Sequence, residues 1–429
     1  MPSPQSSPSL EALRFFTPAQ VAATRAQFGT PIYVYDQATL RRNAQACLAF
    51  PNAFGLTVRF AMKACPNAAI LRFFESLGLH FDASSGWEAA RALRAGVAPG
   101  KISLATQEMP ANFADLHQRG ILFSACSLNQ LERFGRQFPG GKLGIRFNPG
   151  LGSGHSGKTN VGGPGSSFGI WHEWMEQVHD IVTNHRLRVV KIHTHIGSGT
   201  DPAVWQRVSK MTLTLAREFP ELETVNLGGG FKVARVTGEK TTDLQMVGAT
   251  VKTLFEARAR ESGQRLRLEI EPGTYLVAQA GALVCSVQDI VSTGKTGHEF
   301  LKLDAGMTEI LRPSLYGSQH AIVTVPASGR RKTKKENRQY LVVGHCCESG
   351  DLLTPAPGQA ETLAPRWLER AEVGDLCVIE GAGAYCAGMS AKNYNSFPEA
   401  PEALLEAGGK LRLIRKRQAL DQIVQNEVS

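Results

Sequence analysis

The 429-residue sequence lacks the features of a secreted or membrane-spanning chain. No stretch approaches the roughly 18 uninterrupted apolar residues of a transmembrane helix, and the opening MPSPQSSP lacks the basic start and apolar centre of a signal peptide. The eight cysteines show no paired spacing typical of a zinc site and are expected to be reduced. We therefore expect a cytoplasmic protein with no membrane association and no metal site.

The sequence also has little that favours nucleic-acid binding, although its net charge is +9. The one dense basic run, RRKTKK at 330–335, contains no aromatic residue and lies in no recognisable binding motif. We interpret it as a solvated hairpin loop and expect no nucleic-acid partner.

Short β-rich runs alternate with segments of helical periodicity over 46–281. Eight such runs, the number in a (β/α)8 barrel of TIM type, occur at 57–63, 80–85, 102–106, 122–127, 143–148, 189–196, 224–230 and 267–273. Over 282–429 strands follow one another with little helix between them, which predicts a mostly antiparallel β domain. The first 45 residues are expected to belong partly to that domain.

Lys63 is the most informative residue, because it ends an apolar run, FAMK, where a lone amine is costly to bury. A desolvated lysine has a lowered pKa and can form a Schiff base, which suggests a pyridoxal phosphate (PLP) site. The other candidates also end predicted strands, at the active face of such barrels. They are Asp82, His195, Ser198, Gly228, Gly229, Gly230, Glu271 and Gly273.

Several of these residue types suit a PLP site. The glycine triplet at 228–230 can present backbone N–H groups to a phosphate, although it also suits an ordinary βα turn. Glu271 can keep a pyridine nitrogen protonated, whereas Glu269, two residues earlier, also points inward and is a candidate for a structural role. His195 is either a core histidine or a ring that stacks on the cofactor.

Two further motifs have competing interpretations. The run GSGHSGKT at 152–159 matches a P-loop, but the glycine-rich and serine-rich sequence after it cannot continue as the helix that a P-loop requires. We therefore do not expect nucleotide hydrolysis. Cys346 and Cys347, followed by Glu348, offer a thiol beside a carboxylate, and adjacent cysteines equally fill a core.

Taken together, the motifs resemble the PLP-dependent decarboxylases of the alanine-racemase-like barrel class, and within that class the diaminopimelate decarboxylases. The resemblance covers nearly the whole chain. It rests on the following runs, which occur in the family's order: FAMKA at 60–64, RFNPG at 146–150, HIGSG at 195–199, EPG at 271–273, RPSLY at 312–316, CESGD at 347–351, GAY at 383–385 and NYNS at 393–396.

The resemblance implies roles for individual residues. Lys63 carries PLP, His195 stacks on the ring, Glu271 pairs with the ring nitrogen, and Ser198, the glycines and Tyr385 hold the phosphate. It also implies a head-to-tail homodimer with shared active sites, in which Cys347 and Glu348 of the partner subunit complete each site. Cys347 then returns a proton to the substrate, and decarboxylation needs no metal.

The chain departs from the family pattern where the substrate is bound. Thr274 follows Glu-Pro-Gly where diaminopimelate decarboxylases usually have an arginine, Phe397 replaces another arginine, and His345 replaces a proline. Loss of a guanidinium from a carboxylate site weakens specificity for a dicarboxylate. Arg312 and Tyr316 remain as expected substrate contacts, and Glu348 could pair with a distal ammonium.

These departures lead us to predict a decarboxylase of D-ornithine or D-lysine that forms putrescine or cadaverine. Three alternatives remain open. They are a meso-diaminopimelate decarboxylase that forms L-lysine, a decarboxylase of a carrier-bound or siderophore precursor, and a non-catalytic decarboxylase-like binding protein.

Overall fold

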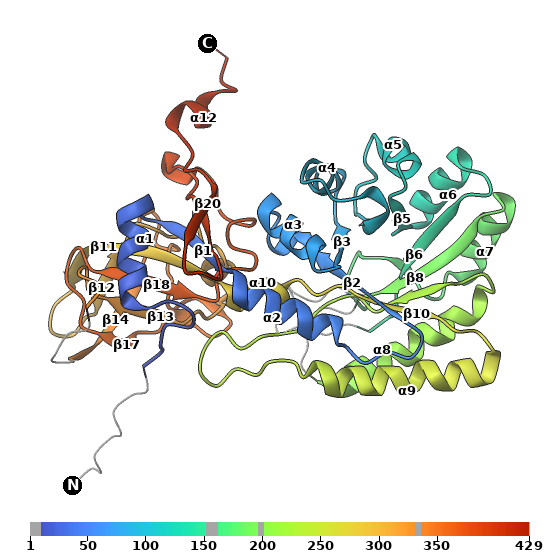
Figure 1. Ribbon diagram of the computed structural model, residues 1–429, viewed down its shortest axis with the longest axis horizontal. Coiled ribbons are helices and arrows are strands. Elements are labelled where there is room, and N and C mark those ends of the chain that lie inside the picture. The colour runs from blue at the N-terminus through green and yellow to red at the C-terminus, as the bar shows by residue number, and fades with distance from the viewer. Residues whose placement is uncertain (1–9, 152–161, 196–200, 331–335, 429) are drawn as a thin grey trace, which may run out of the picture. The chain divides into compact units, whose positions relative to one another are not determined.

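The structure is a computed structural model that describes residues 10–151, 162–195, 201–330 and 336–428 (Figure 1). The chain divides into two compact units. The first comprises Met1–Leu40, Ala234–Glu239 and Val277–Ser429, and the second comprises Arg41–Val233 and Lys240–Leu276. We describe the second unit first, because it contains Lys63.

The second unit is a closed barrel of eight parallel strands, which confirms the predicted TIM-type fold. The strand order is β5-β4-β3-β2-β10-β9-β8-β6, and pairing of β5 with β6 closes the ring. The strands are β2 (Leu56–Ala61), β3 (His80–Ala83), β4 (Ile102–Ala105), β5 (Leu122–Ala125), β6 (Lys142–Asn148), β8 (Arg188–Thr194), β9 (Thr224–Asn226) and β10 (Arg267–Ile270), and the short β7 (Ile170–Trp171) pairs with β6.

Several barrel helices begin at side-chain caps. Ser85, Ser127 and Asp243 each accept a hydrogen bond from a backbone N–H of the first helical turn, which satisfies donors that a helix start leaves free. The helices are α2 (Gln37–Leu48), α3 (Ala68–Ser76), α4 (Gly86–Arg94), α5 (Phe113–Gln118), α6 (Leu128–Gln137), α7 (Met175–Asn184), α8 (Pro202–Leu215) and α9 (Leu244–Ser262).

The barrel interior holds a buried ionic network as well as apolar side chains. The Glu269 carboxylate lies 2.7 Å from the Arg59 guanidinium and 3.4 Å from the Lys191 ammonium, and Lys191 Nζ donates to Ser103 Oγ at 2.7 Å. Burial raises the pKa of Glu269, but the two cations lower it overall, to about 2. Glu269 is therefore an ionised carboxylate that pairs with two cations inside the barrel, in keeping with a structural role.

The first unit is built on a nine-stranded, mostly antiparallel sheet, as predicted. Its central strand β11 (Gly281–Ser292) pairs with β1 (Ile32–Asp36), β12 (Glu299–Leu303) and β18 (Leu376–Glu380). The other strands are β13 (Ile322–Val325), β14 (Asn337–Val343), β17 (Arg366–Glu369), β19 (Glu402–Leu405) and β20 (Leu411–Arg415), and a separate pair is formed by β15 (Pro355–Ala356) and β16 (Gln359–Leu363).

Alternating apolar residues of these strands form the core of the first unit. Val34, Val284 and Val378 are buried in one cluster with Phe16 and Ala403. Three helices complete this unit: α1 (Pro18–Phe28), α11 (Arg312–Tyr316) and α12 (Leu420–Val424). The short helix α10 (Thr274–Val277) lies in the barrel unit except for its last residue. In the part of the chain that the structure describes, no helix is both long and apolar enough to cross a membrane.

Candidate active site

Lys63 lies on a single 3-10 turn, Met62–Ala64, directly after β2. Strand β2 ends two residues earlier than the sequence suggests, so the turn leaves the amine exposed rather than desolvated. The backbone N–H of Ala61 donates to the Pro272 carbonyl at 3.2 Å, which ties this end of β2 to the segment after β10. Lys63 therefore lies at the C-terminal rim of the barrel.

Glu271 is a buried carboxylate held by two neighbours at the same rim. Asn226 Nδ2 donates to Glu271 Oε1 at 2.6 Å, and His193 Nε2 lies 3.3 Å from Oε2. Burial raises the pKa of Glu271, but the imidazoles of His193 and His195 and the Lys191 ammonium lower it well below its usual value. Glu271 is therefore an oriented, ionised acceptor.

His195 is fixed by the glycine-rich turn that follows β9. Its Nδ1 accepts a hydrogen bond of 3.0 Å from the Gly229 N–H. Burial, with the charges of Arg146 and Lys63, lowers the pKa of His195 well below its usual value. The ring is therefore neutral, and because Nδ1 accepts, Nε2 carries the proton.

The turn at 228–230 requires glycine for steric reasons. A Cβ on Gly228, which has φ of 71°, would collide with the His195 ring, and one on Gly229 would collide with the Glu271 carbonyl. The Gly228 N–H donates to Asn226 Oδ1 at 2.7 Å and the Gly229 N–H to His195. Within the described residues this leaves the Gly230 N–H as the one backbone donor of the triplet without an acceptor.

Asp82 lies at the end of β3, the strand next to β2. Its side chain is buried, and Oδ1 has no hydrogen-bond partner among the described residues. Burial and the Glu271 carboxylate raise the pKa of Asp82 well above its usual value, and the Lys63 ammonium opposes this shift. A buried acceptor without a donor marks a place for a ligand group.

The arrangement at the barrel rim fits PLP. It combines an exposed primary amine, a neutral imidazole, an oriented carboxylate and a buried aspartate oxygen without a donor. A glycine turn that excludes side chains lies beside them. Ser198, predicted to contact the phosphate, and the P-loop-like run at 152–159 lie outside the described residues.

The remaining predicted residues belong to the first unit. Cys347 and Glu348 lie in an exposed loop whose base is Asp351, a buried carboxylate that accepts from the backbone N–H groups of Met307 at 2.6 Å and Cys346 at 2.9 Å. The Cys347 N–H donates to Asn395 Oδ1 at 2.9 Å. The loop at 347–348 is thus fixed at both ends.

Other predicted residues of this unit are also held in defined conformations. Tyr385 has φ of 57°, a left-handed conformation that is costly for a non-glycine residue and is found most often at functional sites. The Arg312 guanidinium lies 5.7 Å from the Tyr316 ring centroid. Thr274 begins the short helix α10 of the barrel unit, directly after Gly273.

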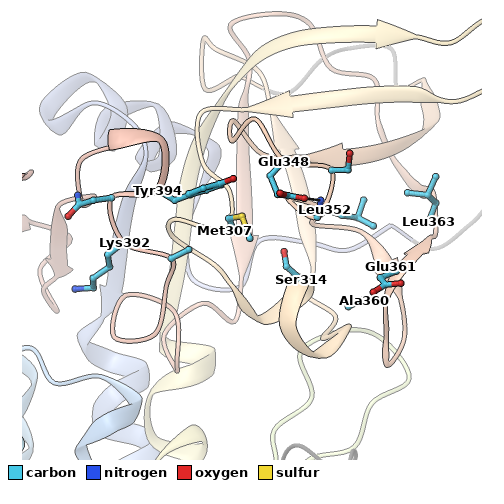
Figure 2. A pocket seen from close by; sticks show the side chains of 13 residues that line it. Met307, Ser314, Glu348, Leu352, Ala360, Glu361, Leu363, Lys392 and Tyr394 are labelled. Carbon is cyan, nitrogen blue, oxygen red and sulfur yellow. Dashed lines mark hydrogen bonds between the residues drawn. The ribbon is translucent and has the colours of Figure 1, made fainter.

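The first unit also contains an open hollow of about 840 Å³ (Figure 2). Glu348 and Tyr394 face it with Met307 between them, and Leu352 and Leu363 contribute apolar walls. Most of its lining surface is apolar, and the charged side chains of Glu348, Glu361 and Lys392 also line it.

Two important neighbours of Glu271 escape motif-based prediction. His193 and Asn226 are paired across β8 and β9, and Asn226 is paired in turn with Glu269 of β10. The alternation in His193-Thr194-His195 does contain a usable signal, because residues two apart in a strand face the same side. Asn226 has no comparable signal, since its role depends on the strand register.

Known proteins resemble this chain over nearly its whole length. Residues 39–278 match the family described as pyridoxal-dependent decarboxylase, pyridoxal binding domain. Diaminopimelate decarboxylase of Escherichia coli (strain K12) is 37% identical over 410 residues, which cover 94% of this chain and 95% of the relative. That of Streptomyces coelicolor is 37% identical over 420 residues, with coverage of 95% and 92%.

Solved structures agree with this similarity. A crystal structure of diaminopimelate decarboxylase matches with a TM-score of 0.89 at 35% identity, and covers 96% of this chain and 98% of that chain. A lysine/ornithine decarboxylase from Vibrio vulnificus, complexed with putrescine, matches with a TM-score of 0.73 but is only 20% identical, which shows the fold alone.

The prediction of a D-ornithine or D-lysine decarboxylase is therefore wrong. It rested on the departures at Thr274, Phe397 and His345, whereas the similarity over the whole chain is to diaminopimelate decarboxylases. The amine, carboxylate and imidazole at the barrel rim agree with the cofactor of the matched family. This chain belongs to the family of PLP-dependent decarboxylases with an alanine-racemase-like barrel, and it is an enzyme that uses PLP.

Proposed function

We propose that this enzyme is a meso-diaminopimelate decarboxylase, which releases carbon dioxide from one end of its substrate and forms L-lysine. The observation that carries the proposal is the 37% identity, over 94% or more of the chain, to diaminopimelate decarboxylases of two bacteria. A crystal structure of a diaminopimelate decarboxylase from Helicobacter pylori complexed with L-lysine also matches over 94% of the chain, at 28% identity.

In this reaction the bond between Cα and its carboxylate breaks, and a proton takes the place of the lost carbon dioxide. PLP, when bound, accepts the electron pair left on Cα. Lys63 would supply the amine that attaches the cofactor. Glu271, held by Asn226 and His193, would keep the ring nitrogen protonated.

The neutral state of His195 suits a ring that lies against the cofactor. A cationic imidazole would oppose protonation of the pyridine nitrogen, whereas a neutral one adds no charge. The hydrogen bond that the Gly229 backbone N–H donates to His195 Nδ1 fixes the orientation of the ring. Asp82, Ser198, Tyr385 and the glycines from 228 to 230, with Gly273, are proposed as the further cofactor contacts.

Cys347 is proposed as the group that returns the proton to Cα. Its thiol is exposed in this chain, and the backbone of its loop is fixed by Asn395 and Asp351. Glu348, Arg312, Tyr316 and Thr274 are proposed as substrate contacts.

The proposed activity can be tested directly. Enzyme loaded with PLP is incubated with meso-diaminopimelate, D-lysine, D-ornithine and L-lysine, while carbon dioxide release and L-lysine formation are measured as kcat/KM. We expect meso-diaminopimelate to be preferred, and Lys63→Ala to be inactive on every substrate. Absence of L-lysine formation from meso-diaminopimelate by the loaded enzyme would refute the proposal.

We also propose that the enzyme is a homodimer with shared sites. The largely apolar hollow in Figure 2, with Glu348 facing it, offers a surface that a second copy can cover. Mixing inactive Lys63→Ala subunits with inactive Cys347→Ala subunits should then restore activity. Random pairing at equal amounts predicts about one quarter of wild-type activity, whereas sites completed within one chain predict none.

A further inference from the structure

Arg235 is a buried arginine whose guanidinium has no acidic partner among the residues that the structure describes. It lies in the segment Ala234–Glu239 of the first unit, and its side chain packs along Gly381. Nε makes one long hydrogen bond, 3.4 Å, to the Gly381 carbonyl, and Nη2 is buried with no partner among the described residues. The nearby Glu239 carboxylate accepts instead from the Arg235 backbone N–H, at 2.7 Å.

A second guanidinium, that of Arg312, neighbours Arg235. Burial is the main cause that lowers the pKa of Arg235 to about 9, and the Arg312 charge is the next. Arg312 Nη2 donates to Ser318 Oγ at 3.3 Å, while its Nε is buried without a partner in the described part of the chain. No described carboxylate lies within 4.0 Å of either guanidinium.

The other groups around this pair do not neutralise it. His320 is buried, donates from Nδ1 to the Glu380 carbonyl at 3.0 Å, and has Nε2 without a partner among the described residues. Burial and the charges of Arg235 and Arg312 keep the pKa of His320 well below its usual value. The cluster therefore presents two positive charges, a neutral imidazole and several unused N–H donors.

A buried cation beside a second cation, each with unused donors, is unfavourable unless an anion joins them. A purely structural arginine normally saturates its donors with carbonyls or a carboxylate, whereas Arg235 uses one donor weakly. A carboxylate, which accepts two parallel N–H bonds from a guanidinium, matches these free groups.

We propose that Arg235 binds the distal carboxylate of the substrate together with Arg312, and so supplies the cation that is absent at Thr274. The identity of the ligand rests on the proposed function, whereas the anion site itself rests on the contacts of Arg235 and Arg312. Arg235 is then a residue that determines specificity for a dicarboxylate amino acid.

The test compares Arg235→Met, Arg235→Lys and the control Arg370→Ala with the wild type. Met keeps most of the volume and removes the charge, and Arg370 is an exposed arginine of the same unit, paired with Glu336. We expect Arg235→Met to lower the ratio of kcat/KM for meso-diaminopimelate to that for D-lysine about 100-fold, chiefly through KM. Arg235→Lys keeps the charge but cannot donate two parallel bonds, so its substrate ratio should fall less than that of Arg235→Met. The control Arg370→Ala should leave the ratio unchanged.

Two further measurements on Arg235→Met show whether the variant folds and whether the bound anion is the substrate carboxylate or the cofactor phosphate. Arg235→Met should keep the wild-type melting temperature or exceed it, because it removes a repulsive buried charge. Its PLP affinity, measured from the visible absorbance of the bound cofactor, should be unchanged. A fall in PLP affinity with an unchanged substrate ratio would instead assign the anion site to the cofactor phosphate and overturn the proposal.

The inference and the proposed function can fail separately. An unchanged substrate ratio in Arg235→Met, with wild-type turnover of meso-diaminopimelate, would refute the role of Arg235 alone. If the wild type does not turn over meso-diaminopimelate, the proposed function is refuted. Binding of a simple dicarboxylate, glutarate, then tests whether Arg235 and Arg312 form an anion site. Glutarate should raise the melting temperature of the wild type but not of Arg235→Met, and an equal rise in both would refute the site.

Discussion

Glu309→Gln should make the protein more stable at pH 8 and flatten the pH dependence of its stability. Glu309 is only 1% exposed, and Oε1 has no hydrogen-bond partner among the described residues. Oε2 accepts from Thr308 Oγ1 at 2.7 Å and from the Gly306 N–H at 3.1 Å. Burial is the main cause that raises the pKa of Glu309 from 4.5 to about 7.

The sign of the effect follows from proton binding. Between about pH 4.5 and pH 7 the folded state holds a proton on Glu309 that the unfolded state has lost, so stability falls as the pH rises through this range. A rise of the pKa from 4.5 to about 7 corresponds to about 3 kcal/mol, as an order of magnitude. Gln does not titrate, so this part of the fall should disappear.

Thr308 links Glu309 to His345, which lies two residues before Cys347. Thr308 Oγ1 lies 2.7 Å from both Glu309 Oε2 and His345 Nε2, and it can donate its single hydrogen to only one of them. While Thr308 donates to Glu309, it accepts from His345 in the tautomer that carries the proton on Nε2, and the His345 ring stacks on Phe397 with centroids 3.6 Å apart. Glutamine, with its amide nitrogen at the Oε1 position, keeps the carbonyl acceptor for Thr308 but gives it no hydrogen.

Urea denaturation of the wild type and Glu309→Gln at pH 5 and pH 8 measures the effect. The control is Glu336→Gln, because Glu336 is an exposed glutamate whose pKa is lowered by hydrogen bonds from Arg370 and Arg338. The wild type should lose more stability than Glu309→Gln between the two pH values. Equal losses in both proteins would mean that Glu309 titrates normally and would refute the reasoning.

Three further predictions concern the barrel rim. Lys63→Ala should abolish turnover and the visible absorbance of covalently attached PLP, and an unchanged spectrum would exclude Lys63 as the attachment site. Asn226→Ala removes the 2.6 Å hydrogen bond to Glu271, so kcat should fall by about 10- to 100-fold while PLP is retained. Steady-state kinetics and cofactor absorbance measure these two effects, and a wild-type kcat would show that His193 alone positions the carboxylate. Gly229→Ala places a methyl group against the Glu271 carbonyl, so equilibrium dialysis should show weaker PLP binding, and unaltered affinity would show that the turn adjusts.

The fold could be predicted well from the sequence because its signals are local. Each barrel strand is a short β-rich run followed by a polar or glycine-rich rim and a helical segment. The predicted strands extended too far at their C-terminal ends, as at β9, which ends at Asn226 rather than at Gly230. Beyond the last paired residue of a strand the chain continues into a turn that contacts the site. Composition alone does not separate the strand from this turn.

The candidate site was only partly predictable, because its geometry depends on contacts between strands. Lys63, His195 and Glu271 stand out by residue type at a strand end. Asn226 acts through its register beside Glu269 on β10, and no local pattern in the chain specifies that register. The exposure of Lys63 depends on where β2 stops, which is set by backbone bonds such as that from Ala61 to Pro272.

The substrate was misassigned for an electrostatic reason. A carboxylate site is defined by the sum of the charges and donors around the anion, and a cation missing at one position can be supplied by a distant segment of the chain. Thr274 shows only that one guanidinium is absent. Arg235, some 40 residues earlier, is buried with donors unused beside Arg312, and on our proposal it restores the missing charge. A substitution in a binding motif therefore predicts a change of substrate only after the buried charges elsewhere in the fold have been accounted for.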